Sequence, residues 1–359
     1  MLDAQNDELP FITGRSKDGF KGALLQNGDI IIADTAEDET TGKVCEIVNI
    51  QDKDVVAGLH TMVCRPKNKT AEGYFGYYMN SSSYHHQLLP LMQGIKVLSL
   101  SKTNVQKTTV KYPKDKAEQQ KIADCLRRID TLITLHQRKY EKLVNIKKSM
   151  LDEMFPKNGA SVPEIRFKGF TDLWEQRKIS ELAEKTYGGG TPTTSNEAFW
   201  NGNIPWIQSS DIVDGKLMGV EPRKYITQTG LNSSATQLVP KNSIAIITRV
   251  GVGKLAYMPF SYSTSQDFLS LSKLNTEPFF TVYACYKKLQ SELNTVQGTS
   301  IKGITKDELL AKTISVPVYS EQKQIGSFFA QLDTLITLHQ RKLEKLQNIK
   351  KSCLEKMFV

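Results

Sequence analysis

The ten-residue stretch DTLITLHQRK occurs twice in this chain, at Asp130–Lys139 and again at Asp333–Lys342. The copies extend further, because only five of 26 positions differ between Asp130–Phe155 and Asp333–Phe358. An identity of this length does not arise by chance. The chain therefore contains an internal repeat, and whatever the first copy does in the structure, we expect the second copy to do as well.

Both copies predict a long helix. The stretch 126–155 contains no Gly or Pro and is rich in Leu, Ile, Lys, Glu and Gln, all of which favour helix. Apolar residues recur at steps of three and four, which marks one face of a helix. In the first copy this face comprises Ile129, Leu132, His136, Tyr140, Leu143, Ile146, Met150 and Met154. With starts near Glu118 and Glu321, each helix is on the order of 57 Å long at 1.5 Å per residue.

A stripe this narrow needs a partner, and the other copy is the obvious one. The alternative is that each helix packs on its own globule. The identity, however, includes positions that we expect to be exposed, and packing on one globule does not require them. Two equivalent surfaces that dock two copies of one partner would require them. These candidate docking residues are Gln137, Arg138, Asn145 and Lys147, with their counterparts Gln340, Arg341, Asn348 and Lys350.

A weaker repeat lies upstream of the helices. LLQNGDIIIADT (Leu24–Thr35) parallels LVPKNSIAIITR (Leu238–Arg249), and both predict a turn followed by a buried strand. TGKVCEI (Thr41–Ile47) parallels VGKLAYM (Val252–Met258). We therefore expect an α+β protein with two mixed α/β globules, each followed by a long helix. The segment Val162–Asp211 has no counterpart in the first half, so the first globule is either truncated or takes its opening segment from elsewhere.

The composition limits the class of protein. The 39% hydrophobic and 24% charged residues of the 359-residue chain are ordinary for a soluble protein with two domains. No apolar run approaches a membrane span, the start MLDAQNDELP is no signal peptide, and the five cysteines form no CxxC pair. We expect a bacterial cytoplasmic protein. The formal net charge of +9 favours an anionic partner, nucleic acid before membrane.

The order of globules and helices along the chain, together with three sequence motifs, resembles the specificity subunit of a Type I restriction-modification system. The resemblance rests on PEIRFKGFTDLWEQRKISEL (Pro163–Leu182), GGGTPTTSNEAFWNGNIPWIQSSDI (Gly188–Ile212) and EQKQIGSFFAQLDTLITLHQRKLEKL (Glu321–Leu346). It implies target-recognition domains at 1–115 and 159–318, with conserved spacer helices at 116–158 and 319–359 that pair antiparallel like a coiled coil. The shorter first domain departs from the family pattern.

The resemblance also implies partners and roles. The chain would be a non-catalytic subunit that binds double-stranded DNA and docks two methyltransferase subunits, with motor-nuclease subunits in the full complex. S-adenosylmethionine would be bound by the methyltransferase subunits, and this chain would hold no cofactor of its own. Recognition of a target in two parts requires two DNA-binding globules, here called reading heads, and a rigid spacer that fixes the distance between them. Half-sites one helical turn apart lie about 34–36 Å from centre to centre, which a helix pair of the expected length can span.

For the two reading heads, we look to loops that join glycine to Lys, Arg, Gln, Ser or Thr. Glycine lets the backbone approach the duplex, lysine and arginine neutralise phosphate, and glutamine or arginine can pair with base edges. In the second globule the candidates are Thr191, Thr193, Thr194, Arg249, Lys254, Ser265, Gln266, Gln297, Ser300 and Lys302. In the first globule they are Thr41, Lys43, His60, Gln93 and Lys96. A polar loop with no DNA contact is the alternative for each.

Other functions find little support in the sequence. VGVGK lacks the spacing of a phosphate-binding loop, and His85 and His86 have no acidic or Cys partner at ligand spacing, so we expect no metal site. Two alternatives stay open. One is a helical interaction scaffold without sequence-specific DNA binding, and the other is a metal-dependent nuclease that works through the acidic cluster Asp34–Glu39.

Overall fold

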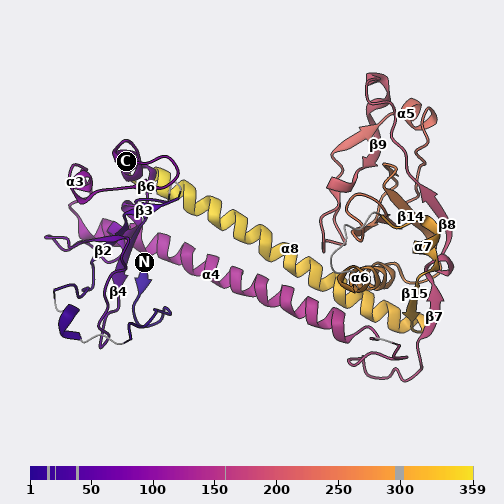
Figure 1. Ribbon diagram of the computed structural model, residues 1–359, viewed down its shortest axis with the longest axis horizontal. Helices are drawn as coiled ribbons and strands as arrows, with labels where there is room; N and C mark the ends of the chain where they lie inside the picture. The colour runs from indigo at the N-terminus through magenta and orange to yellow at the C-terminus, as the bar shows by residue number, and fades with distance from the viewer. Residues whose placement is uncertain (14–16, 21, 38–39, 158, 296–302, 359) are drawn as a thin grey trace. The chain divides into compact units, whose positions relative to one another are not determined.

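The computed structural model describes residues 1–13, 17–20, 22–37, 40–157, 159–295 and 303–358. The chain divides into two compact units, which Figure 1 labels by element. Unit 1 comprises Met1–Arg138 together with Gln340–Val359, and unit 2 comprises Lys139–His339. Each unit therefore holds one globule and a portion of each long helix.

Unit 1 is built on a four-stranded sheet with the order β1–β4–β2–β5. These strands are β1 (Leu2–Asp3), β4 (Val44–Val48), β2 (Ile30–Ala33) and β5 (Thr61–Cys64). Strand β2 pairs antiparallel with β4 and β5, and β1 pairs parallel with β4. Ile30 and Ile32 are buried because alternate side chains of β2 point to the same face of the sheet. The predicted strand in Leu24–Thr35 is confirmed.

The core of unit 1 is rich in aromatic residues. Tyr74 and Tyr78 lie in the short helix α1, and their rings meet the ring of Phe358, which follows the second long helix, edge to face. Leu126 of the first long helix is fully buried in the same cluster. The remaining elements are η1 (Lys17–Phe20), β3 (Thr35–Ala36), α1 (Tyr74–Tyr78), α2 (Ser82–Leu88), η2 (Leu89–Leu91), β6 (Leu98–Ser99) and α3 (Lys102–Val105).

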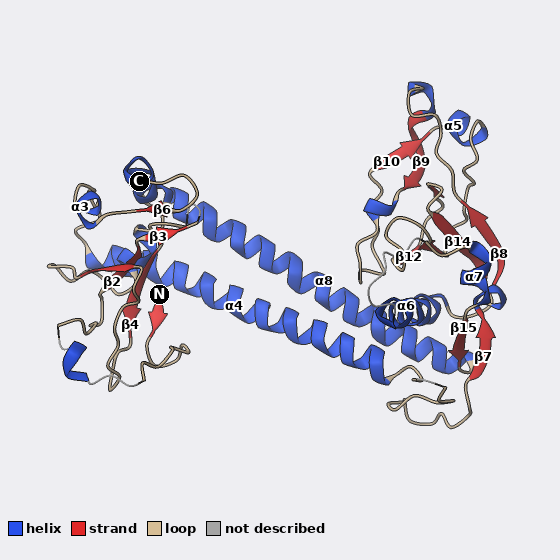
Figure 2. Cartoon of the chain, viewed as in Figure 1, coloured by secondary structure: helices blue, strands red, loops and turns tan. Residues whose placement is uncertain are grey.

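Unit 2, whose strands are drawn in red in Figure 2, contains three antiparallel strands that correspond to β4, β2 and β5 of unit 1, together with an additional strand. Its main sheet has the order β12–β11–β14–β8, antiparallel throughout. These strands are β12 (Leu255–Met258), β11 (Ser243–Ile247), β14 (Phe268–Leu274) and β8 (Ala183–Gly188). A three-stranded sheet orders β10 (Lys224–Ile226), β9 (Trp200–Ile207) and β13 (Ser263–Thr264), and β15 (Thr313–Val316) pairs with β7 (Glu175–Lys178). The helical elements are η3 (Ile179–Glu181), η4 (Glu197–Phe199), η5 (Ser209–Asp211), α5 (Gln228–Asn232), α6 (Pro278–Thr295) and α7 (Lys306–Ala311).

The two predicted long helices are confirmed as α4 (Lys116–Glu153) and α8 (Tyr319–Lys356). In unit 2, Phe155 after the end of α4 contacts Phe329 near the start of α8. In unit 1, Leu126 near the start of α4 shares a core cluster with Phe358 after the end of α8. The helix segments therefore run antiparallel within each unit. No helix in the described part of the chain combines the length and the apolar character needed to cross a membrane.

The buried face of the helices differs from the predicted one at two positions. Leu132 is 45% exposed, and its neighbour Ile133 is partly buried instead. Lys147, which we predicted to be exposed, is 9% exposed. One series of buried or half-buried positions follows steps of three and four, the seven-residue repeat of paired helices. This series comprises Leu126, Ile129, Ile133, His136, Tyr140, Leu143, Lys147 and Met150 of α4, with Met154 directly after the helix.

Candidate nucleic-acid interface

Both units carry the same glycine–lysine turn beside a buried strand. In unit 1, the Ala33 N–H donates to the Lys43 carbonyl oxygen at 2.9 Å. In unit 2, the Ile247 N–H donates to the Lys254 carbonyl oxygen at the same distance. The glycines that precede the lysines lie in the left-handed region of the backbone map: Gly42 (φ 82°) and Gly253 (φ 89°). Only glycine adopts this conformation at low cost, so the turn requires it.

The end of the same strand meets two further loops in each unit. In unit 1, the Asp34 N–H donates to the His60 carbonyl oxygen at 3.1 Å, and the Asp34 carbonyl oxygen accepts from the Leu100 N–H at 2.8 Å. Unit 2 makes both bonds again, from Thr248 N–H to Asp267 O and from Ile304 N–H to Thr248 O, each 2.7 Å. The weak repeat upstream of the helices therefore corresponds to a junction that is present in both units. At this junction the glycine–lysine turn meets a second loop, which contains His60 in unit 1 and Asp267 in unit 2, and the segment before the long helix.

Unit 2 adds another loop to this junction. The Thr191 hydroxyl donates to the side-chain carbonyl of Gln266 at 2.7 Å, which ties the glycine-rich loop to the loop before β14. Gly189 is required there, since a Cβ at this position would lie 1.8 Å from the Ser265 carbonyl oxygen. Gly190 is equally confined, with a Cβ position 2.5 Å from the Thr236 nitrogen. Two loops chosen from the sequence as parts of one reading head are thus in direct contact.

The segment that supplies the glycine-rich loop of unit 2 has no counterpart in the first half of the sequence. The main sheets differ in the same way. Strand β14 lies between β11 and β8, whereas its counterpart β5 pairs with β2 alone in the described residues. Both differences follow from the segment 162–211, which supplies β8 and the glycine-rich loop to unit 2.

Most predicted DNA-binding residues of unit 2 that the structure describes are accessible. Thr191, Thr193, Thr194, Arg249 and Gln266 are exposed, and Lys254 is half-buried. Ser265 corrects the prediction, because it is 5% exposed and its hydroxyl donates to the Asp267 carboxylate at 3.2 Å. In this conformation the Ser265 side chain is not accessible to a ligand. The predicted residues Gln297, Ser300 and Lys302 lie outside the described residues.

In unit 1 the predicted residues divide in a similar way. Lys43, His60, Gln93 and Lys96 are exposed, and the His60 imidazole lies 3.8 Å from the Asp34 carboxylate. Thr41 is a second correction. It is completely buried, and its hydroxyl donates to the Leu98 carbonyl oxygen at 3.2 Å.

Two basic residues that the sequence analysis missed extend the candidate interface of unit 2. Lys224 of β10 lies over the ring of Trp206, with its ammonium 5.8 Å from the ring centroid. The Trp206 indole N–H donates to the Gly190 carbonyl oxygen at 3.0 Å, which places Lys224 near the glycine-rich loop. Arg223 precedes it and is more than half exposed while it pairs with Asp211 at 2.5 Å. The adjacent Arg and Lys in EPRKY were the signal in the sequence.

An ion pair between the buried carboxylate of Asp29 and the half-exposed Arg65 supports the sheet of unit 1 near the start of β2. The Asp29 carboxylate is 1% exposed and accepts from Arg65 Nη2 at 2.6 Å and from the Gln26 N–H at 2.7 Å. Burial by itself would raise the pKa of Asp29. The hydrogen bonds from Arg65 and Gln26 outweigh burial, so the pKa lies below its ordinary value. The pair therefore holds the turn before β2 in place.

The candidate docking residues on the helices also need one correction. Arg138, Asn145, Gln340, Arg341 and Asn348 are exposed, and Gln137 and Lys350 are half-buried. Lys147 is buried and ion-paired within unit 2, so it is not available to a partner. Exposed leucines, which were not predicted as docking residues, lie at equivalent positions of the two copies. These are Leu132 (45%) and Leu135 (48%) on α4, and Leu335 (43%) and Leu338 (45%) on α8.

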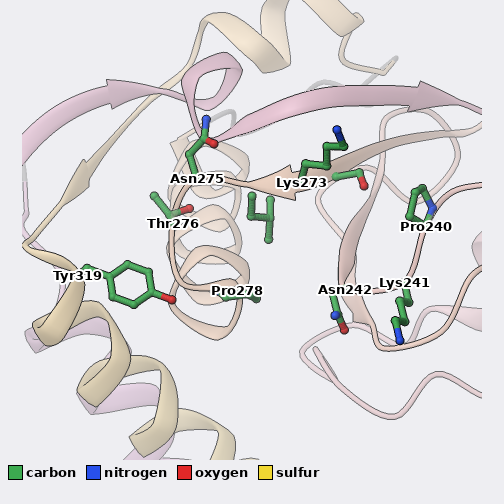
Figure 3. A pocket seen from close by; sticks show the side chains of 10 residues that line it. Pro240, Lys241, Asn242, Lys273, Asn275, Thr276, Pro278 and Tyr319 are labelled. Atoms are coloured by element: carbon green, nitrogen blue, oxygen red, sulfur yellow. The ribbon is translucent and has the colours of Figure 1, made fainter.

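A shallow pocket of about 370 Å³ in unit 2 is lined by Lys241, Asn242, Lys273, Thr276 and Tyr319 among others (Figure 3). Its ten lining residues include no carboxylate and no imidazole, the usual general bases. Within the described ranges, no three side chains of His, Cys, Asp or Glu come together as a metal site.

Comparison with known proteins identifies the family. The family model for the Type I restriction modification DNA specificity domain matches residues 3–145 and 171–348, which is most of the chain. The chain belongs to this family. The two matched ranges correspond to the two halves of the repeat, each with its globule and long helix.

Curated members of the family are distant relatives. The putative type I restriction enzyme MjaX specificity subunit of Methanocaldococcus jannaschii is 22% identical over 335 residues, which is 90% of this chain and 76% of that protein. The MjaIX specificity subunit of the same organism is 26% identical over 52% of this chain and 44% of its own length. The EcoR124I/EcoR124II specificity subunit of Escherichia coli is 30% identical over 45% and 41%. The match spans less than half of the latter two relatives.

Solved structures of this family share the fold. The Type I restriction-modification system S subunit from M. genitalium matches with a TM-score of 0.65 at 15% identity, covering 93% of this chain and 83% of its own. A chain from a structure on complex assembly and conformational transition of the type I R-M system matches with a TM-score of 0.54 at 19% identity, over 93% and 82%. At such low identities the likeness shows a common architecture.

Proposed function

We propose that this chain is the DNA-recognition subunit of a Type I restriction-modification complex and reads a target in two parts. One observation carries the proposal, namely that the same loop junction occurs in both units, each time followed by a nearly identical long helix. A single globule can touch only a short stretch of duplex. Two similar globules joined to paired helices are suited to two half-sites at a fixed separation.

The chemistry of the loops supports DNA as the ligand. Exposed Arg249 and Gln266 can donate to base edges in the major groove, where Arg pairs with guanine and Gln with adenine. Lys254 and Lys224 can neutralise phosphates, and the glycine-rich loop lets backbone N–H groups approach the duplex. We place the recognition domains at 1–115 and 159–318, with the spacer helices at 116–158 and 319–359.

The first recognition domain offers a smaller reading surface in its described residues. It presents Lys43, His60, Gln93 and Lys96, without a counterpart of the glycine-rich loop. We therefore expect its half-site to be shorter, or more tolerant of substitution, than the half-site of the second domain.

The partners follow from the repeated exposed surface of the helices. Exposed leucines at equivalent positions, with Arg138 and Arg341 beside them, form two like patches that suit two copies of one subunit. We assign these patches to two methyltransferase subunits, with motor-nuclease subunits in the full complex. The chain itself would be non-catalytic, and S-adenosylmethionine would be held by the methyltransferase subunits.

The test is selection from a randomised pool of DNA duplexes with the chain co-expressed with its methyltransferase subunits. We expect a two-part motif with one fixed gap, bound with an affinity that falls steeply as salt rises, because phosphate contacts release counterions. The methyltransferase subunits without this chain are the control and should enrich nothing. If no DNA sequence is enriched at low or moderate salt, the proposal is wrong, and the chain acts as a helical interaction scaffold without sequence-specific DNA binding.

A further inference from the structure

A buried polar network joins the two helices to the globule in unit 2. Lys147 Nζ of α4 lies 2.5 Å from the Asp333 carboxylate of α8, and their side chains are 11% and 14% exposed. The Tyr283 hydroxyl of α6 donates to the other Asp333 oxygen at 2.5 Å. Lys147 also donates to the Gly215 carbonyl oxygen at 3.0 Å and lies 5.7 Å from the centroid of the Tyr283 ring.

Unit 1 contains the same network with the roles of the helices exchanged. Lys350 Nζ of α8 lies 2.6 Å from the Asp130 carboxylate of α4. The Tyr77 hydroxyl of α1 donates to the other Asp130 oxygen at 2.9 Å, and Lys350 lies 5.9 Å from the centroid of the Tyr77 ring. Asp130 and Asp333 occupy one position of the repeat, and Lys147 and Lys350 occupy another. In each unit, an aspartate of one copy pairs with a lysine of the other copy.

The tyrosines complete the pairing as neutral donors. Burial first, and then the neighbouring carboxylate of Asp333, raise the pKa of Tyr283. Burial and the Asp130 carboxylate raise the pKa of Tyr77 in the same way. Each aspartate therefore receives a hydroxyl donor from the globule and an ammonium from the opposite helix. The network therefore fixes the position of one helix along its axis relative to the other helix and to the globule.

The lysines occupy positions of the seam that are otherwise filled mostly by apolar side chains. Lys147 falls between Leu143 and Met150 in the alternation of three and four, and Lys350 falls between Leu346 and Cys353. Two helices paired through an apolar seam can slip by one seven-residue repeat, because the apolar side chains of each helix then face apolar side chains of the other helix once more. A lysine in such a seam specifies the register, since a slip would leave the buried charges of Lys147 and Asp333 without partners and would separate the Lys350–Asp130 pair, whose side chains are 31% and 34% exposed.

We propose that the Tyr–Asp–Lys networks around Asp130 and Asp333 are positioning devices that fix the register of α4 against α8, and through it the gap between the half-sites. The effect on the gap rests on the proposed function, whereas the effect on the helix register does not depend on it. A slip of seven residues shifts one helix by about 10 Å along the other, which corresponds to roughly three base pairs at 3.4 Å each.

The test replaces each ion pair with apolar side chains of similar size, because such replacements often keep or raise stability. The variant carries Lys147→Met and Asp333→Leu in unit 2 with Lys350→Met and Asp130→Leu in unit 1. Selection from the randomised pool should then yield two or more gap lengths, about three base pairs apart, where the unmodified complex yields one. The control is Lys148→Met with Lys351→Met, the exposed neighbours of the two lysines, which should keep the single gap.

A second readout does not depend on DNA. Spin labels at Lys148→Cys and Thr334→Cys, both exposed in unit 2, report the helix register in a chain whose native cysteines are replaced by alanine. We expect one distance with the network intact and additional distances displaced by up to about 10 Å in the apolar variant. An apolar variant that folds and keeps both one distance and one gap would overturn the inference. Broadened distances with a single gap would overturn the link to the gap. If the unmodified complex selects no motif, the proposed function fails while the distances still decide the register.

Discussion

The Thr191 hydroxyl lies 2.7 Å from the side-chain oxygen of Gln266, and this bond joins two loops that are 75 positions apart in the chain. The approach depends on Gly189, whose Cα faces the Ser265 carbonyl oxygen with no space for a side chain. The glycine-rich loop of unit 2 is therefore part of the candidate interface because of a close backbone contact, and its position can be tested without altering any of the candidate DNA-binding side chains.

Gly189→Ala should displace the glycine-rich loop. The added Cβ would lie 1.8 Å from the Ser265 carbonyl oxygen, so the backbone must move, at a cost of about 1–3 kcal/mol in stability. We expect DNA affinity to fall at least tenfold while the methyltransferase subunits still bind. The control is the adjacent Gly188→Ala, where a Cβ meets nothing within 4 Å. Equal affinity for the two variants would show that this loop is not part of the interface.

The exposed leucines should be needed for docking of the methyltransferase subunits. Leu132→Ser with Leu135→Ser on α4 should abolish one docking site, because apolar contact area is lost from a surface that otherwise stays folded. The assembly measured by native mass spectrometry should then hold one methyltransferase subunit in place of two. Adding Leu335→Ser and Leu338→Ser should remove the second. Leu59→Ser, at a residue that is 98% exposed in unit 1, is the control. Two bound subunits in the fourfold variant would refute the assignment.

Asp29→Asn should lower the stability of unit 1 at neutral pH. The variant loses a charge-assisted bond to Arg65, worth about 1.5–3 kcal/mol. The pKa of Asp29 is lowered in the folded state, so the ion pair stabilises the fold above the unfolded pKa of about 3.9 and loses this effect as pH falls through the folded pKa. Urea unfolding at pH 7 and at successively lower pH should show a difference that shrinks below about pH 4. Asp52→Asn, at an exposed position, should change neither value, and a difference independent of pH would contradict the account.

The free edge of β5 should exchange its amide hydrogens faster than β14. Strand β14 is covered by β8 through residues Leu269–Leu274, whereas β5 has only β2 as a partner in the described residues. Val63 on this strand is 39% exposed, as expected for an edge. Hydrogen exchange followed by mass spectrometry should give protection at least tenfold lower for Thr61–Cys64 than for Phe268–Leu274. Equal protection would mean that another segment covers the edge.

The sequence predicted the long helices well because their signals are local. The absence of glycine and proline and the steps of three and four are sufficient to place α4 and α8 within a few residues. The exact face was harder to predict. Leu132 and Ile133 are both apolar, and only the seven-residue repeat of a helix pair selects Ile133. The burial of Lys147 could not be predicted, since its partners Asp333 and Tyr283 are distant in the chain.

The candidate interface could be predicted only in outline. The loops that combine glycine with polar residues do meet in unit 2, because glycine is required where backbones approach closely. Which side chains remain accessible depends on tertiary contacts. Ser265 turns toward Asp267, and Thr41 turns toward Leu98, although both have the composition of a binding loop. Lys224 was missed because its stacking over Trp206 appears only once β10 and β9 pair.

The central claim is that each unit reads one half of the target, and the most direct test is selection with Arg249→Ala, at an exposed residue of unit 2. The randomised pool would be offered to the assembled complex that carries this variant in unit 2. A lost base contact costs about 1–3 kcal/mol at one position. We predict that one position in one half-site becomes tolerant while the other half-site and the gap stay unchanged. A motif altered in both halves, or a motif altered in neither half, would contradict the assignment of one half-site to each unit.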